Sequence, residues 1–310
     1  MKFVVLGAGG LGGYLGAALL RAGHDVQLVT RGQHLEVIRR DGLHVREPTG
    51  GYLVRIPCAA SGLDVERPDV VLVTVKTYAL DGVAPQVHYL AEQGALVVPL
   101  LNGVDAVERL EAMGVRSDRL LAGLAYVTAF RTGPGVIERK GEHGRIVLSP
   151  PGPVGGAASA TLVTPIARAL ESAGLVVEVS SDIRMELWRK MAVVCTLAAL
   201  CGPSGSTLGP LRAHPAGDRL QRAAVAEVLQ VARALGVPLD SEEESRVAAV
   251  LDAFPDGFYP SLLHDLATGI PTEIDALNGT VSRLGRVHEV PTPVHDLTTV
   301  AIQLREARGR

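Results

Sequence analysis

The chain has 310 residues, a length that suits two domains, and 47% of them are hydrophobic, enough for a large core. The 20% of charged residues is typical of a folded protein, and a net charge of −3 argues against nucleic-acid binding, which needs a basic surface. No apolar run reaches the length of a membrane span, and the three scattered cysteines form neither a disulfide framework nor, with histidines, a zinc motif. We therefore expect a cytoplasmic protein with no metal, no membrane association and no nucleic-acid partner.

Apolar, β-rich runs alternate with helical stretches through the first half of the chain. The N-terminal run leads into a glycine turn, unlike a signal peptide. Strands are predicted at Lys2–Leu6, Asp25–Thr30, Asp69–Lys76, Ala95–Leu101 and Leu120–Ala129. Unbroken apolar runs suit strands buried on both faces, and the alternation predicts an α/β fold with a parallel, doubly wound Rossmann-type sheet.

Shorter elements follow these strands. Leu43–Glu47 and Tyr52–Ile56 flank a Pro-Thr-Gly-Gly turn and predict an inserted hairpin. Gly135–Lys140 and Arg145–Ser149 predict two edge strands around a glycine-rich turn. A loop at 150–158, a helix at 162–173 and a last strand at 176–180 complete the first half.

From residue 182 onward the sequence predicts helices alone, punctuated by prolines. We expect a Rossmann domain at 1–181 that binds NADP, and an all-helical domain at 182–310 for substrate binding and catalysis. The catalytic cleft is expected between them.

A glycine-rich motif follows the first predicted strand and opens a helix. It reads Gly7-Ala8-Gly9-Gly10-Leu11-Gly12 and matches G-x-G-x-x-G. In a dinucleotide site the first glycine permits a tight turn, the second lets the backbone approach the diphosphate, and the third lets helix and strand pack closely. The diphosphate then lies at the helix N-terminus. The alternative is a purely structural glycine turn.

The end of the second strand bears on the choice of cofactor. An NAD enzyme usually has an acidic residue there for the ribose 2′-hydroxyl. This strand ends in Thr30 and Arg31 without an acid. Because a guanidinium can pair with a 2′-phosphate, the pattern favours NADP, with Thr30 and Gln33 assisting Arg31. A solvated loop arginine is the alternative.

Two further strands end in polar residues. Lys76 follows one buried run, and Asn102-Gly103 follows the next. Since the carboxyl ends of parallel strands meet at one edge, where such sheets bind ligands, both are candidates for the same crevice. A rim lysine and a simple turn are the alternatives.

Taken together, these residues and the helical second half resemble the ketopantoate reductase (2-dehydropantoate 2-reductase) family over essentially the whole chain. The elements that carry the resemblance are the glycine motif, Arg31, Val75-Lys76, Asn102-Gly103, Trp188-Arg189-Lys190, Ser261-Leu262-Leu263-His264-Asp265, Thr272-Glu273-Ile274-Asp275 and Asn278-Gly279. It implies NADPH-dependent reduction of a 2-oxo acid, foremost ketopantoate to pantoate in pantothenate biosynthesis.

The resemblance also implies roles for individual residues. Lys190 is similar to the catalytic lysine that polarises and protonates the ketone, chemistry that needs a cation near the developing alkoxide. Glu273 matches the glutamate that binds substrate, helps to place the lysine and borders the cofactor. Ser261 matches the serine that contacts the substrate carboxylate, while Lys76 and Asn102 match residues that line the cofactor and substrate sites. Without the resemblance, Glu273 would be interpreted as a first-turn helix acid after Pro271.

One departure from the family pattern concerns the helix that carries Lys190. The family usually has asparagines four and eight residues after the lysine, where this chain has Val194 and Ala198. Losing two amides weakens recognition of a substrate hydroxyl. A paralogous enzyme for another 2-oxo or 3-hydroxy acid therefore stays open as an alternative. An NADP-binding sensor without turnover is a second alternative, although a sensor needs none of Lys190, Glu273 and Ser261. The sequence also leaves open whether the chain is a monomer or a homodimer.

Overall fold

The computed structural model describes residues 1–150 and 157–308, which fall into two compact units. The first unit contains Met1–Leu101 and Asp105–Ile183, and the second contains Asn102–Val104 and Arg184–Arg310. The division after Ile183 lies close to the boundary expected near 181. Most of the loop expected at 150–158 lies outside the described residues.

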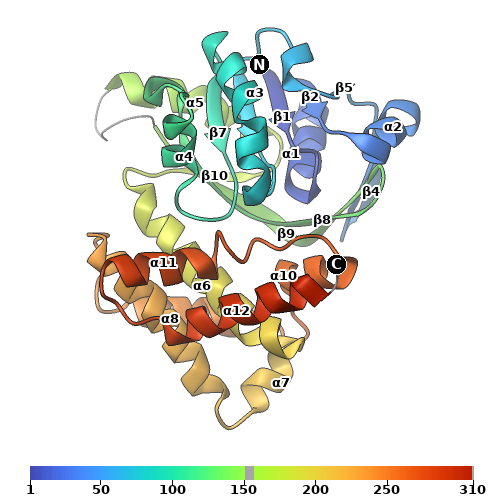
Figure 1. The fold of residues 1–310 in the computed structure, drawn as a ribbon. Helices are drawn as coiled ribbons and strands as arrows, with labels where there is room; N and C mark the ends of the chain where they lie inside the picture. Colours follow the sequence, from blue (N-terminus) through green and yellow to red (C-terminus); the bar gives the residue numbers. More distant parts are fainter. Residues whose placement is uncertain (151–156, 309–310) are drawn as a thin grey trace. The chain divides into compact units, whose positions relative to one another are not determined.

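Five parallel strands form the first sheet, in the order β5–β2–β1–β6–β7 (Figure 1). Their bounds are β1 (Lys2–Leu6), β2 (Asp25–Val29), β5 (Cys58–Ala59), β6 (Val70–Val73) and β7 (Leu96–Pro99). The predicted parallel Rossmann-type sheet is confirmed, although β2, β6 and β7 end sooner than expected. The strand expected at Leu120–Ala129 is not part of it: Ala122–Gly133 pairs antiparallel in a second sheet, and the fifth parallel strand is β5, which was not predicted. The strand order reverses between β1 and β6, the position where sheets of this kind bind ligands.

Helices cover both faces of this sheet. Their bounds are α1 (Gly10–Arg21), α2 (Gly32–Asp41), α3 (Leu80–Glu92), α4 (Ala106–Ala112) and α5 (Ala157–Ser172), with short 3-10 turns η1 (Gly62–Asp64), η2 (Thr77–Ala79) and η3 (Ser117–Arg119). Side chains of a strand alternate between its faces. Phe3 and Val5 accordingly share a core with α1 and α5, whereas Val4 and Leu6 share another with α3 and α4.

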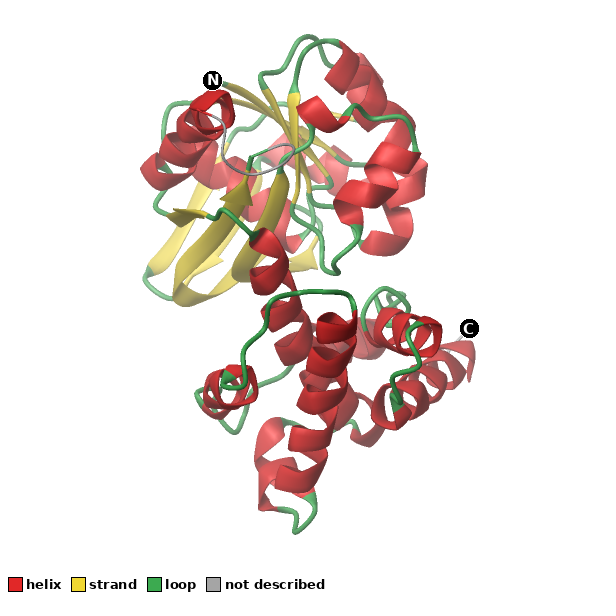
Figure 2. Cartoon of the chain, turned by 90° about the vertical axis from the view of Figure 1, so that its left-hand side faces the viewer, coloured by secondary structure: helices red, strands yellow, loops and turns green. Residues whose placement is uncertain are grey.

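A second, mixed sheet packs against α1. Figure 2 shows the strands of the first unit in yellow. Its strands are β3 (Leu43–Glu47), β4 (Gly50–Val54), β8 (Ala122–Gly133), β9 (Val136–Ser149) and β10 (Val176–Val179). The predicted β3–β4 hairpin is confirmed. The two predicted edge strands are wrong: they form one continuous strand, β9, in the middle of the sheet. β8 pairs along one side of β9, while β3 and β10 pair with successive halves of the other side, so both halves of β9 are held by neighbours.

The second unit has no strand within its described residues, as predicted. Its helices are α6 (Ile183–Ser204), α7 (Leu208–Ala213), α8 (Gly217–Ala234), α9 (Glu243–Asp252), α10 (Ser261–Thr268), α11 (Asn278–Val287) and α12 (Pro293–Arg308). Trp188, Met191 and Cys195 follow the three- and four-residue spacing of one helix face and enter the core with α8 and α11. In the described part of the chain, no helix combines the length and apolar character needed to cross a bilayer.

Candidate functional site

The glycine motif has the geometry that a dinucleotide site requires. Gly7 has φ +103°, a conformation open mainly to glycine, and its N–H donates to the Val29 carbonyl at 3.0 Å. A Cβ on Gly12 would lie 2.1 Å from the Gly7 carbonyl oxygen, so only glycine allows this approach of α1. At Gly9 a Cβ would meet nothing within 4 Å. The half-buried Gly9, with open space at its Cβ position, and the N-terminus of α1 thus fit a diphosphate.

A threonine that the sequence analysis missed supports this loop. The Thr74 hydroxyl donates to the Gly7 carbonyl at 2.8 Å and lies 2.2 Å from the position of a Cβ on Gly12. It follows β6 directly, and its apolar surroundings in the sequence gave no sign of a polar role. Lys76 was predicted to be the last residue of this strand, but β6 ends at Val73. Lys76 lies three residues beyond it, half-buried and directly before the turn η2.

Arg31 lies two residues beyond β2 at the same edge of the sheet. It precedes α2 in extended conformation, its side chain is exposed, and the first turn of α2 contains no acidic residue. Thr30 is half-buried and Gln33 is exposed. Because Val29 accepts the hydrogen bond from Gly7, the turn that carries Arg31 is tied to the glycine motif.

Three of the predicted site residues, Asn102, Lys190 and Glu273, belong to the second unit and interact there. Asn102, which follows β7, groups with this unit, and its Nδ2 donates to Glu273 Oε2 at 3.0 Å. Glu273 is buried, and it lies in the turn before α11 rather than in the first turn of a helix, which removes the helix-dipole interpretation. Burial lowers the pKa of Lys190 to about 8, and the Glu273 carboxylate acts in the opposite direction. The Glu273 carboxylate thus interacts with both other groups: it accepts a hydrogen bond from the Asn102 amide and acts electrostatically on the Lys190 amine.

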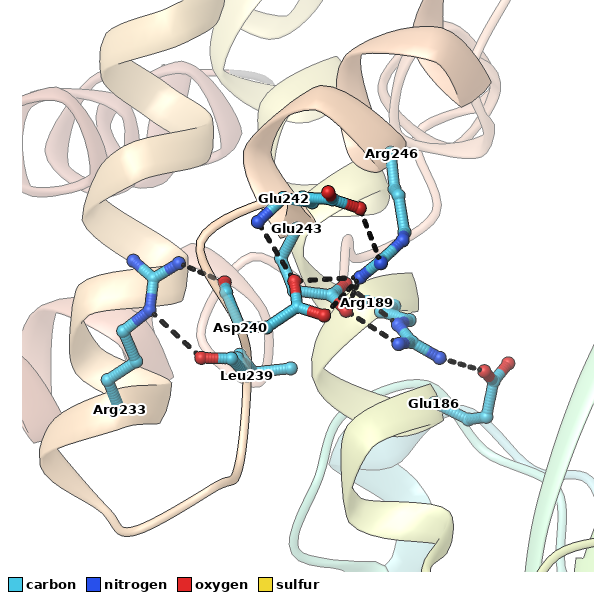
Figure 3. A network of polar contacts seen from close by, with 8 residues as sticks. All are labelled: Glu186, Arg189, Arg233, Leu239, Asp240, Glu242, Glu243 and Arg246. Carbon is cyan, nitrogen blue, oxygen red and sulfur yellow. Dashed lines mark hydrogen bonds and ion pairs between the residues drawn. The ribbon is translucent and has the colours of Figure 1, made fainter.

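The lysine-bearing turn of α6 is fixed by an ion-pair network (Figure 3). Arg189 donates to both oxygens of Glu243, at 2.8 Å and 2.6 Å, and to Glu186 at 2.7 Å. Glu243 is fully buried and also accepts from Arg246 at 2.6 Å. A bidentate pair to a buried carboxylate is costly to break, so α6 is held against α9 at the residue next to Lys190.

Asn278, in the last of the sequence elements that carry the family resemblance, has a structural role. Its Nδ2 lies 3.0 Å from the Cys195 carbonyl oxygen and 2.9 Å from His295 Nδ1. Asn278 is fully buried, and it thereby joins α11 and α12 to α6 at Cys195, five residues after Lys190. Ser261, by contrast, is exposed at the first position of α10.

Comparison with known proteins decides the family. The family described as "Ketopantoate reductase PanE/ApbA" matches residues 3–153, and "Ketopantoate reductase PanE/ApbA C terminal" matches residues 182–306. A 2-dehydropantoate 2-reductase of Halobacterium salinarum is 32% identical in an alignment that covers 100% of this chain and 100% of that protein. The chain belongs to the ketopantoate reductase family. It is therefore an oxidoreductase that acts on CH–OH groups, which sets the sensor alternative aside.

Proteins similar to this chain carry names that give different substrates. A 2-dehydropantoate 2-reductase of Mesorhizobium japonicum is 30% identical over 98% of this chain and 97% of its own length. A PanE/ApbA family ketopantoate reductase of Ralstonia eutropha aligns with a TM-score of 0.89 at 28% identity over 100% and 99% of the two chains. A D-mandelate dehydrogenase with NADH and anilino(oxo)acetate aligns with a TM-score of 0.90 at 26% identity over 100% and 99%. The family thus uses NAD(P)H on small keto acids.

Proposed function

We propose that the protein reduces a 2-oxo acid to the 2-hydroxy acid with NADPH, ketopantoate being the first candidate because relatives carry that name. The observation that carries this proposal is Lys190, half-buried, with a pKa lowered to about 8 and with Glu273 close enough to oppose that shift. A lysine of this kind is suited to proton transfer near neutral pH.

In this proposal bound NADPH supplies the hydride, and residues of the chain meet the charge that appears on the substrate oxygen. The Lys190 ammonium donates a hydrogen bond to the ketone oxygen and then its proton to the developing alkoxide. Glu273, held by Asn102, orients the ammonium and binds substrate. Ser261 and Lys76 contribute to the binding of substrate and cofactor.

The use of lysine in this chain supports the proposed role. Of the 30 basic residues only four are lysines, and two of these four are Lys76 and Lys190. Arginine stays charged at any pH that proteins tolerate, so its guanidinium is a poorer proton donor than a lysine ammonium. A protein that uses arginine for most of its cations thus has one of its few lysines at the proposed proton donor.

The assay that tests the proposal is NADPH oxidation with a panel of 2-oxo acids. Saturable turnover on one or more of them supports it. Absence of turnover on the whole panel, by a protein that binds NADPH, would contradict it.

Arg31 tests the choice of cofactor. Arg31→Ala should weaken NADPH binding about tenfold, because a charge-assisted contact with the 2′-phosphate is lost, and leave NADH binding nearly unchanged. Dissociation constants from nucleotide fluorescence titrations measure both. The exposed Arg116→Ala, in a surface ion pair with Asp118, serves as control. Equal losses for both nucleotides in Arg31→Ala, or a wild type that prefers NADH, argue against the assignment.

A second candidate is a 2-oxo acid with an apolar side chain. Val194 and Ala198 follow Lys190 by four and eight residues, on one side of α6. Ala198 is buried in an apolar cluster with Leu262 and Ile274, the residues next to Ser261 and Glu273. An apolar wall cannot hydrogen-bond a substrate hydroxyl.

Two substrates that differ by one hydroxyl distinguish the candidates. If the apolar candidate is right, 2-oxo-3,3-dimethylbutanoate should exceed ketopantoate in kcat/KM by roughly 10- to 100-fold, the range within which an apolar surface discriminates against an added hydroxyl. Val194→Asn should narrow or reverse that ratio, while Val250→Asn, at an exposed position of α9, should leave it unchanged. A wild type that prefers ketopantoate decides for the first candidate.

A further inference from the structure

A buried histidine of α2, His34, lies against the glycine motif. Its Nε2 is 2.8 Å from the Ala8 carbonyl oxygen, and the Gly135 N–H donates to its Nδ1 at 2.9 Å. The side chain is 4% exposed, so both ring nitrogens are satisfied by backbone groups alone. No local sequence pattern marks this residue.

These two contacts fix the protonation of the ring. A backbone N–H can only donate, so Nδ1 is an acceptor without a proton, and Nε2 carries the hydrogen that goes to Ala8. Burial lowers the pKa of His34 and the nearby Arg131 acts in the same direction, whereas the bond to Ala8 opposes them. His34 is thus a neutral donor aimed at a single carbonyl.

The carbonyl that it holds shares a peptide plane with the Gly9 N–H. In a trans peptide the C=O and N–H bonds point in opposite directions, so a carbonyl held at His34 directs the Gly9 N–H away from the ring. No cis peptide is present in the described part of the chain. If this plane were to rotate, the Ala8 carbonyl oxygen would take the place of the Gly9 N–H. A Cβ on Gly9 would meet nothing within 4 Å, so there is open space beside this residue.

His34 also links the glycine motif to the turn at Arg31, because its ring contacts Ala8 and its helix begins directly after Arg31. His34 is the third residue of α2, three residues after Arg31. Gly135 has φ +70° and accepts a hydrogen bond from the His44 N–H at 2.8 Å, which anchors it to β3. A Cβ on Gly135 would lie 2.5 Å from Val37 of α2, so this approach depends on glycine.

We propose that His34 is a positioning residue of the dinucleotide site, which holds the Ala8–Gly9 peptide with its N–H turned toward the cofactor diphosphate. This role rests on the proposed use of NADPH. It adds a residue that does not touch the cofactor and acts through the backbone of the glycine motif.

Three variants of His34 separate its two hydrogen bonds. His34→Ala removes both and should raise the NADPH dissociation constant about tenfold, with kcat at saturating NADPH nearly unchanged. His34→Gln keeps a donor near the place of Nε2 and should bind NADPH almost as the wild type does. His34→Asn keeps only an acceptor near Nδ1, so it should resemble His34→Ala.

His295 provides the matched control, because it is equally buried and bonded at both ring nitrogens but lies in the second unit. His295→Ala should lower the thermal midpoint without changing the NADPH dissociation constant. The role of His34 is overturned if His34→Ala binds NADPH normally, if His295→Ala weakens binding equally, or if the Gln and Asn variants do not differ. If His34→Ala fails to fold, the difference in NADPH dissociation constant between His34→Gln and His34→Asn still tests the role of His34. A wild type that binds neither NADPH nor NADH overturns the proposed function itself.

Discussion

Lys190→Ala is expected to lower kcat for 2-oxo acid reduction by about 10²–10³-fold, the usual cost of removing one preorganised donor at a developing oxyanion. The alkoxide formed by hydride addition then has neither a cation nor a proton donor. NADPH binding should persist, because the glycine motif and Arg31 belong to the first unit and Lys190 to the second. Steady-state kinetics with saturating NADPH, together with a fluorescence titration of NADPH, measure both quantities.

Two further lysine variants test whether the loss of rate is specific to the Lys190 ammonium. Lys190→Arg keeps a cation and should recover only part of the rate, since guanidinium is a poor proton donor. Lys140→Ala removes an exposed lysine that pairs with Glu138, and it should keep the wild-type kcat. A Lys190→Ala enzyme with near wild-type kcat on its best substrate contradicts the catalytic assignment.

The parts of the fold that the sequence could predict are those with strong local patterns. Four of the five parallel strands, β1, β2, β6 and β7, are mainly apolar runs, and the glycine motif imposes its own turn, so these were predicted correctly. The two-residue strand β5 was not predicted, and the run at Leu120–Ala129 was wrongly expected in the same sheet, because its antiparallel pairing with β9 leaves no local pattern. The continuity of β9 could not be predicted, because its middle contains Gly141 and Gly144, which are typical of a turn, and its pairing depends on distant strands.

The supporting residues of the site were hidden for a related reason. Thr74, His34 and Glu243 act through partners far along the chain: Gly7, Ala8 and Arg189 respectively. A sequence pattern reports periodicity and spacing, whereas a hydrogen bond between distant segments leaves no local pattern. Lys190 and Glu273 were found through the family resemblance, and the structure adds that burial lowers the pKa of this lysine and that the Glu273 carboxylate opposes the shift.

The pH dependence of turnover should follow the titration of Lys190. Burial lowers its pKa from 10.5 to about 8, against the influence of the Glu273 carboxylate. Reduction uses the protonated amine, so kcat should be at its maximum below pH 7 and fall about tenfold per pH unit above 8, roughly 100-fold by pH 10. Oxidation of the 2-hydroxy acid uses the neutral amine, so its kcat should rise through the same range.

Glu273→Gln tests the sign of the electrostatic effect on Lys190. A nearby carboxylate favours the ammonium form, so its removal takes away the influence that raises the pKa. The midpoint of the reduction profile should therefore move below 8, and at neutral pH the variant should lose rate because less of the amine is protonated. Profiles of kcat at saturating NADPH and substrate, recorded for wild type and variant in one buffer series, measure the shift. A profile that stays flat to pH 10, or a midpoint that moves upward in Glu273→Gln, would show that another group supplies the proton.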